Sequence, residues 1–263
     1  MTEHNAGSPG DSGGGDHRLT LRFLGDLDFF LSARAGRRHY DVRRRASVKD
    51  IIQSFGVPHT EVGEICHNRR IVDFSFIPET GGRLTVSPVS PPFDVCSGTR
   101  LRPDPLDAVR FIADLNVLKL GRYLLFLGYD VRLAFDLPDK GIAAAARQER
   151  RIVLTRDTRL LFRRNVLFAR RIRRVSPMDQ LKEILAFFGL KPSPVLFFTR
   201  CVRCNRGLEP VEKNEILHRL EPKTRKYFHR FLRCPACRQI FWKGSHYDRI
   251  LDRFRASGVL KTR

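Results

Sequence analysis

The stretch from Val109 to Asp157 is VRFIADLNVLKLGRYLLFLGYDVRLAFDLPDKGIAAAARQERRIVLTRD, and it decides the fold. The short apolar segments FIAD and RIVLTRD each end at an aspartate, Asp114 and Asp157. Between them, LNVLKLGRYLLFLG and GIAAAARQE are typical of helices, and YDVRLAF is typical of a strand. Strands that alternate with helices predict βαβ units and a parallel sheet.

Side chains at the carboxyl ends of parallel strands converge on one crevice, where ligands usually bind. Carboxylates in such a crevice suit Mg²⁺, which prefers oxygen ligands and keeps several waters. Asp114 and Asp157 are the strand-end candidates, although a lone aspartate at this position is more often a turn or cap residue. Asp139, at the start of the alanine-rich helix, is the third candidate, with Asp136 in the preceding loop as its alternative. Thr155 is expected to orient a neighbouring carboxylate.

The charge of the chain is strongly positive. Its 263 residues include 49 Lys and Arg against 28 Asp and Glu, a formal net charge of +21. An excess of this size favours polyanions, and nucleic acid is the expected partner because phosphate neutralisation supplies most non-specific affinity. No apolar run approaches the length of a membrane span, and no signal-peptide pattern follows Met1. We therefore expect a cytoplasmic protein without a membrane partner.

Four of the six cysteines form two C-x-x-C pairs near the carboxyl end. The first pair is CVRC, Cys201 and Cys204, and the second is CPAC, Cys234 and Cys237, after a 29-residue insert. Four thiolates complete a closed tetrahedral site about 2.3 Å from one zinc ion, which makes the metal structural. A redox pair and an iron–sulfur cluster are the alternatives. Zinc is favoured because both pairs lie outside any βαβ pattern.

The amino-terminal part divides into a tail and a small domain. Residues 1–17 lack apolar side chains to bury and are expected to be disordered. Residues 18–90 show the order strand, strand, helix, strand, strand, in LTLRFL, RRHYDV, VKDIIQSFG, EICHNRRI and RLTVSP. This order resembles a ubiquitin-like β-grasp domain of the sulfur-carrier type. Because no terminal Gly-Gly follows, we expect an interaction or RNA-docking module, with an unknown protein partner, rather than a sulfur carrier. A simple fused scaffold is the alternative. The proline-rich residues 91–105 are predicted to be a linker.

The succession of motifs then resembles a known family. FIADLNVLKLGRYLLFLGYDV, IVLTRDTRLL, SPMDQLKEIL, RCVRCNRGL and FLRCPACRQIFWKGSHYDRI together are similar to the Mut-7 C-terminal RNase family. The resemblance implies an α/β fold with a PIN-like parallel-sheet domain over residues 106–195. A zinc ribbon would follow over residues 196–250, with a basic tail at 251–263 and the ubiquitin-like domain in front.

The family resemblance also implies a ribonuclease that depends on Mg²⁺ or Mn²⁺. By position, Asp114, Asp139 and Asp157 would be the catalytic acids, with Asp136 and Thr155 as further candidates at the cation. The basic residues around this site and in the ribbon are expected to contact RNA: Arg151, Arg156, Arg159, Arg163, Arg164, Lys243 and His246. The alternative is a non-catalytic RNA- or ribosome-binding protein that retains the PIN fold.

Overall fold

The computed structural model describes residues 17–31, 38–42, 45–79 and 81–260. Apart from His17, the predicted disordered tail lies outside these residues. The chain forms two compact units, Met1–Val89 and Ser90–Arg263, and each is described by itself. Among the described residues, no helix combines the length and apolar character that crossing a bilayer requires.

The described residues of the first unit form a mixed five-stranded sheet with one α-helix. The strand order is β2-β1-β5-β3-β4, with β1 and β5 parallel and the other pairs antiparallel. The elements are β1 (Arg18–Phe23), η1 (Gly25–Phe30), β2 (Arg38–Asp41), α1 (Val48–Ser54), η2 (His59–Glu61), β3 (Val62–His67), β4 (Arg70–Ile71) and β5 (Gly82–Pro88). Helix α1 begins where the Ser47 hydroxyl accepts a hydrogen bond from the Asp50 amide, and it buries Val48, Ile51 and Ile52.

The second unit contains the predicted parallel sheet, in the order β7-β6-β8-β9. Its strands are β6 (Arg110–Asp114), β7 (Asp130–Ala134), β8 (Ile152–Thr155) and β9 (Ala169–Arg171), and all three pairings are parallel. Ala113 lies opposite Leu154, so the carboxyl ends of β6 and β8 are neighbours. The prediction of a parallel α/β sheet is confirmed.

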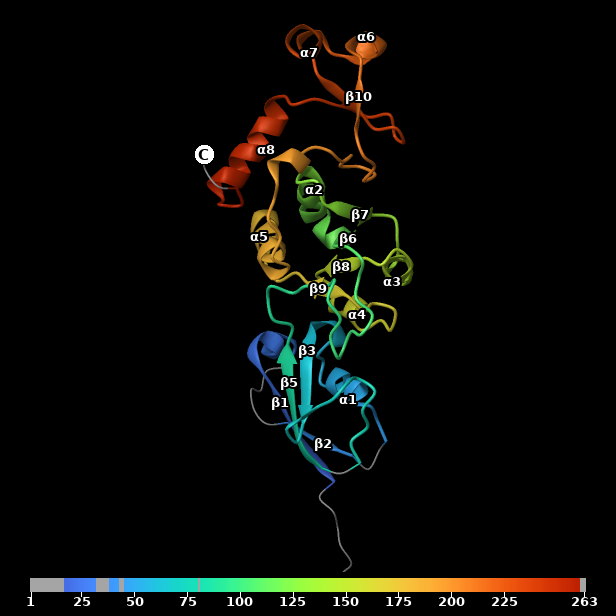
Figure 1. Cartoon of the computed structure of the whole chain (residues 1–263), viewed down its shortest axis with the longest axis vertical. Coiled ribbons are helices and arrows are strands. Elements are labelled where there is room, and N and C mark those ends of the chain that lie inside the picture. The colour runs from blue at the N-terminus through green and yellow to red at the C-terminus, as the bar shows by residue number, and fades with distance from the viewer. Residues whose placement is uncertain (1–16, 32–37, 43–44, 80, 261–263) are drawn as a thin grey trace, which may run out of the picture. The chain divides into compact units, whose positions relative to one another are not determined.

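Helices cover both faces of this sheet (Figure 1). They are η3 (Leu115–Val117), α2 (Leu118–Phe126), α3 (Asp139–Gln148), α4 (Thr158–Leu161) and α5 (Pro177–Phe187). Ile112 and Val153 pack against the alanine side of α3, in a cluster that includes Ile142. On α2, a Cβ atom at Gly121 would lie 2.6 Å from the Leu133 Cδ2 atom, so the glycine lets this helix approach the sheet closely. Ser176 caps α5 as predicted.

Residues 91–105, the predicted linker, form no helix or strand but pack into the second unit. The Phe93 ring lies 6.4 Å from those of Phe168 and Phe188, and Val95 is fully buried. The Arg102 guanidinium lies 5.5 Å from the centroid of the Phe93 ring. The segment therefore contributes to the core of the second unit.

A small antiparallel sheet, in the order β10-β11-β12, follows the parallel one. The elements of this part are η4 (Pro194–Leu196), β10 (Glu209–Val211), α6 (Lys213–Ile216), η5 (Leu217–Arg219), α7 (Pro222–Tyr227), β11 (Phe231–Arg233), β12 (Ile240–Phe241) and α8 (Ser245–Ala256). Its core consists of Val211, Ile216, Leu220, Phe231 and Ile240, with Phe228 and Trp242 packed against it.

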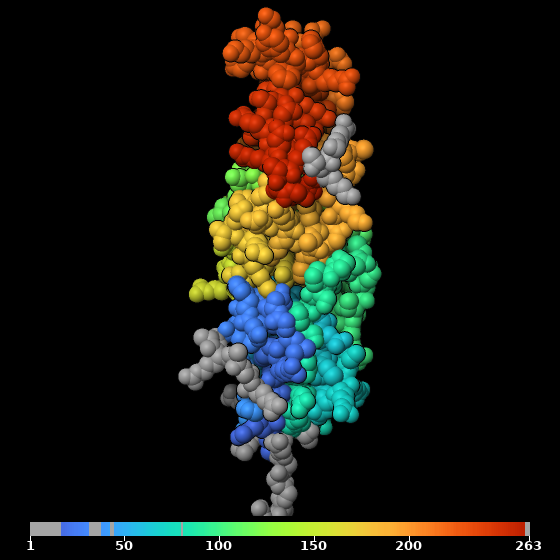
Figure 2. Space-filling model, turned by 90° about the vertical axis from the view of Figure 1, so that its left-hand side faces the viewer, coloured from blue at the N-terminus to red at the C-terminus, as the bar shows by residue number. Residues whose placement is uncertain are grey.

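Helix α8 differs from the prediction of a basic tail from residue 251. It continues to Ala256 because Phe254, which is fully buried, packs its ring 5.3 Å from Tyr123 and 5.7 Å from Phe126 on α2. Both views place α8 (red) between the insert (orange) and the α5 segment (Figure 1, Figure 2). This helix thus joins the antiparallel sheet to the parallel-sheet domain.

Candidate active site and metal centre

Asp114 is an acid of the second unit that hydrogen bonds hold in one orientation. It ends the central strand β6, and only 7% of its surface is exposed. Its Oδ1 atom accepts a hydrogen bond from the Leu115 amide at 2.6 Å, and its Oδ2 atom accepts from Asn116 Nδ2 and Thr155 Oγ1, both at 2.6 Å. A carboxylate offers about four lone-pair positions, so one position on Oδ1 is left for a further ligand.

Thr155 and Asn116 link the ends of β6 and β8. The Thr155 hydroxyl donates to Asp114 and accepts from the Asp157 amide at 2.8 Å, so one oxygen connects both strand-end acids. Asn116 Oδ1 accepts from the Arg156 amide at 3.0 Å. The sequence interpretation included Thr155 but missed Asn116, whose only signal is its place two residues after Asp114.

Asp157 and Asp139 begin the two helices at the same edge of the sheet. Asp157 caps α4, with its Oδ1 atom accepting from the Arg159 amide at 2.8 Å. Asp139 is the first residue of α3, and its Oδ2 atom lies 3.7 Å from Arg163 Nη2. Asp136, the loop alternative, lines a separate cavity beside β7. All three predicted catalytic acids, and Asp136 with them, therefore lie at or after the carboxyl end of a strand.

The carboxylates are not gathered as tightly as a closed metal site requires. In the part of the chain that the structure describes, the one group of three or more acidic, histidine or cysteine ligand atoms within 4.8 Å of one another is the set of four cysteines. Mg²⁺, however, commonly uses one or two carboxylates and keeps waters for the rest. The acids thus fit a hydrated cation better than a fully protein-ligated one.

The predicted RNA-contacting residues have different surroundings. Arg159, Arg163, Arg164, Lys243 and His246 are exposed, and Arg156 is half-buried. Arg151 is different, because its side chain is only 11% exposed and its guanidinium forms ion pairs with Asp130 at 2.5 Å and Glu149 at 2.6 Å. These ion pairs favour a structural role for Arg151, and contact of all seven residues with RNA stays a prediction.

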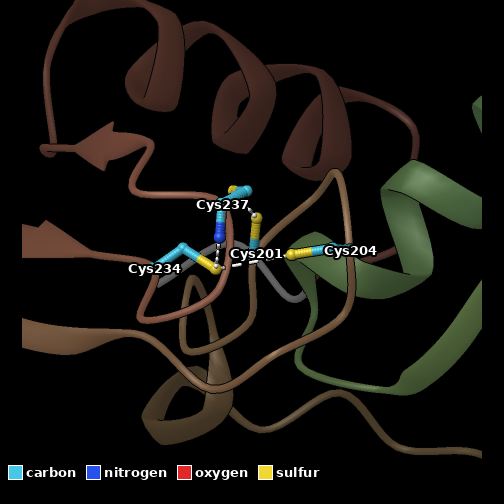
Figure 3. A group of neighbouring side chains, drawn as sticks. All are labelled: Cys201, Cys204, Cys234 and Cys237. Carbon is cyan, nitrogen blue, oxygen red and sulfur yellow. Dashed lines mark hydrogen bonds between the residues drawn. The ribbon is translucent and has the colours of Figure 1, made fainter.

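The four cysteines converge from two loops (Figure 3). The Sγ atoms of Cys201 and Cys237 lie 3.6 Å apart, and those of Cys204 and Cys234 lie 3.4 Å apart. Neither distance is that of a disulfide, which is about 2.05 Å. Sulfurs about 2.3 Å from a tetrahedral zinc ion are separated by about 3.8 Å, so this donor set fits zinc closely. The cluster can hold a metal ion such as zinc.

The two loops repeat one backbone pattern. The Cys201 amide donates to Arg206 O and the Asn205 amide to Cys201 O, while the Cys234 amide donates to Gln239 O and the Arg238 amide to Cys234 O. Asn205 and Arg238 share a left-handed φ of 63° and 59°. We call these loops the first knuckle, residues 201–206, and the second knuckle, residues 234–239.

Without metal, the thiols differ in acidity. Burial raises the pKa of Cys201 to about 12. Burial also acts to raise the pKa of Cys234, but hydrogen bonds, first from the Cys237 amide, lower it to about 7. Because zinc binds thiolates, binding must release the proton of Cys201 at neutral pH.

A polar network that the sequence interpretation missed joins the first knuckle to strand β7. Asn205 Nδ2 donates to Asp130 Oδ1 at 2.8 Å, and Asn205 Oδ1 accepts from the Val131 amide at 3.2 Å. Arg200 donates to Gly128 O at 3.1 Å and to Asn205 Oδ1 at 3.2 Å. Burial opposes ionisation of Asp130, but hydrogen bonds from Arg151 and Asn205 outweigh it and lower the pKa of Asp130. The knuckle is therefore fixed to the edge of the parallel sheet.

Comparison with known proteins gives two matches. A family model described as Mut7-C RNAse domain matches residues 109–254, which is more than half of the chain. A second model, described as Mut7-C ubiquitin, matches residues 17–94. No curated protein and no solved structure matches the chain.

Proposed function

Because the chain belongs to the Mut7-C RNAse domain family, we propose that it is a metal-dependent ribonuclease whose active site lies at the carboxyl edge of the parallel sheet. The resemblance stated from the sequence is confirmed, both for the RNase domain and for the ubiquitin-like domain before it. The family supports a ribonuclease-type function, and the catalytic residues and the metal dependence are our proposal.

The observation that carries the proposal is the Asp114 carboxylate. It is nearly buried at the end of the central strand, and three hydrogen bonds hold it in one orientation. Uncompensated, such a buried charge is costly, and its fixed position suits a group whose task is to place a cation. The Thr155 hydroxyl, which donates to Asp114, also accepts from the backbone amide of Asp157 and so links the two residues.

In the proposed site, Asp114 and Asp157 hold Mg²⁺ or Mn²⁺, and Asp139 completes the acidic edge. The cation supplies charge stabilisation for the phosphodiester and lowers the pKa of an attacking water. Thr155 and Asn116 keep Asp114 oriented. Arg163 lies 3.7 Å from Asp139 and is placed to hold a phosphate beside that acid. We propose the remaining exposed arginines of α4 and the loop after it as further contacts to the RNA backbone.

The test is cleavage of single-stranded and structured RNAs with Mg²⁺ or Mn²⁺. The double variant Asp114→Asn with Asp157→Asn should cleave more than about a hundredfold more slowly. Replacing even a residue that only supports a metal ligand typically costs about 10- to 100-fold in metal affinity or activity. Asp107→Asn is the matched control, because Asp107 precedes β6 at the opposite edge of the sheet and is exposed. Full activity of the double variant would refute the proposal.

A non-catalytic RNA-binding protein is the second candidate. Among the described residues, no three carboxylates have oxygen atoms that all lie within 4.8 Å of one another, and this spacing favours a non-catalytic protein. This candidate predicts RNA binding that weakens steeply with salt, together with no cleavage in either metal. The same RNA panel, read for binding and for cleavage, separates the two candidates.

A further inference from the structure

A charged cavity of about 680 Å³ lies between edge strand β7 and the first knuckle. Five arginines and three acidic residues line it, together with Phe135 and Asn205. The arginines are Arg132, Arg151, Arg200, Arg203 and Arg206. The lining therefore carries an excess of two positive charges.

Three of the arginines are already engaged in the wall. Arg132 forms an ion pair with Glu149, and Arg151 forms ion pairs with Asp130 and Glu149. Arg200 donates to backbone carbonyls and to Asn205. Arg200 also lies 3.8 Å from Asp130, so Asp130 and Glu149 are both paired with arginines and the shape of the inner wall is fixed.

Arg203 and Arg206 are different. Both are exposed on the first knuckle, and neither side chain forms an ion pair with the described residues. Two unpaired guanidinium groups on a fixed wall are suited to phosphate, which they bind in a bidentate manner.

Phe135 adds an apolar surface to this cavity. It follows β7 directly, and 53% of its surface is exposed although it is a large aromatic residue. An exposed ring beside free guanidinium groups is the combination that grips single strands, because every base has a face that stacks.

We propose that this cavity binds a single-stranded segment of RNA, with a base stacked on Phe135 and phosphates held by Arg203 and Arg206. The proposal rests on the proposed function, since it takes RNA as the substrate. A free phosphate would use the arginines but not the ring. A duplex would present phosphates but no open base face.

The position of the cavity supports this use. Phe135 and Asp139 lie in the same connection, between the end of β7 and the start of α3. A strand held on Phe135 therefore lies along the loop that leads to the acidic edge. The cavity would then determine which part of the RNA enters the active site.

A competing role for Arg203 and Arg206 is charge compensation of the metal centre. Zinc with four thiolates carries two negative charges, and both arginines flank Cys204 in sequence. If this role is correct, replacing the two arginines should weaken zinc retention, and replacing Phe135 should have no effect.

The experiment measures binding of a labelled oligouridine to the full, zinc-loaded chain carrying Asp157→Asn, without added divalent cations. In this background, Phe135→Ala should weaken binding about tenfold. The double variant Arg203→Gln with Arg206→Gln should lower the slope of log affinity against log salt by about 1.4, which is two phosphate contacts on a single strand. Lys223→Gln with Arg230→Gln, an exposed pair on the insert, is the charge-matched control.

Binding equal to the control in either variant would overturn the proposal. If the arginine variant loses zinc and Phe135→Ala still binds the oligouridine normally, the arginines belong to the metal centre instead. A hairpin duplex should bind Phe135→Ala as well as the unchanged chain. Binding is measured without cleavage, so a failure of the proposed catalysis would leave the binding result standing. If the chain cleaves RNA but the cavity variants bind RNA as the control does, only the cavity proposal is refuted.

Discussion

Asp114 and Asp157 are both acids at strand ends, yet their surroundings differ. Asp114 Oδ2 faces two donors, Asn116 Nδ2 and the Thr155 hydroxyl. In Asp114→Asn, a side-chain nitrogen at the Oδ2 position would face these two donors and accept from neither. With the side-chain oxygen at that position instead, the nitrogen would face the Leu115 amide, which is also a donor. Asp157 instead caps a helix, a position at which asparagine and aspartate are equally favourable.

We therefore expect Asp114→Asn to destabilise the parallel sheet by about 2 kcal/mol, because it leaves buried donors unpaired. Asp157→Asn should change stability by less than about 0.5 kcal/mol. Native-state hydrogen exchange of the β6 amides measures both values on one scale. Equal losses in the two variants would contradict the description of Asp114 as the fixed acid.

Thr155 and Asn116 both show how far sequence reaches at this scale. Thr155 was predicted to orient a neighbouring carboxylate, but its hydroxyl donates to Asp114, 41 residues earlier, and only accepts from the backbone amide of Asp157. Asn116 acts on Thr155 and Arg156, about 40 residues further along the chain. Such a contact exists only once β6 and β8 are paired, so no local pattern indicates it.

The two knuckles have the same backbone but different side-chain contacts. Asn205 and Arg238 occupy equivalent left-handed positions. The Asn205 side chain bonds to Asp130, Val131 and Arg200. The Arg238 side chain has no such contact with the described residues.

Substitution by glycine should therefore have opposite effects at these positions. Arg238→Gly relieves a left-handed cost of about 1 kcal/mol, which the greater freedom of the unfolded chain partly offsets, so stability stays the same or rises slightly. Asn205→Gly should lose about 2 kcal/mol, because its polar partners are left unpaired. Urea unfolding followed by Trp242, the only tryptophan, reports on this sheet. If Arg238→Gly lowers the free energy of unfolding as much as Asn205→Gly does, this prediction is wrong.

Most strands and helices of the parallel-sheet domain were predictable, because α2 and α3 each bury one face and strands such as β8 are continuous apolar runs. Ser176 and Pro177 also marked the start of α5 correctly. Helix α8 was missed, since its sequence SHYDRILDRFRA is rich in polar and charged residues and only Phe254 is fully buried. A single anchoring residue gives no periodic signal; its partners Tyr123 and Phe126 lie far away in sequence.

At the scale of the whole chain, the net charge of +21 indicated a polyanion but not its location. Several arginines proved to be internal: Arg151 lies in an ion-pair network, and the Arg170 guanidinium lies 4.1 Å from the centroid of the Phe187 ring. Burial of an arginine depends on tertiary contacts, so sequence cannot separate structural arginines from those left for a ligand.

The metal should matter to one part of the second unit and not to another. The antiparallel sheet has strands of two or three residues and five core residues, so it buries little apolar surface. The parallel sheet has its own core between α3 and the strands. We expect removal of zinc by a chelator to expose the amides of β10, β11 and β12 to exchange, while those of β6 and β8 stay protected.

Hydrogen exchange read by mass spectrometry, with and without the chelator, measures this difference directly. Cys201→Ser should reproduce the effect without a chelator, whereas Cys96→Ser, at an exposed cysteine outside the cluster, is the matched control. The amides near Asn205 should show partial protection, because the Asn205 side chain bonds to Asp130 and to the Val131 amide without involving the metal. Loss of protection throughout the second unit would mean that the metal stabilises both sheets together, and no change would mean that the small core folds alone.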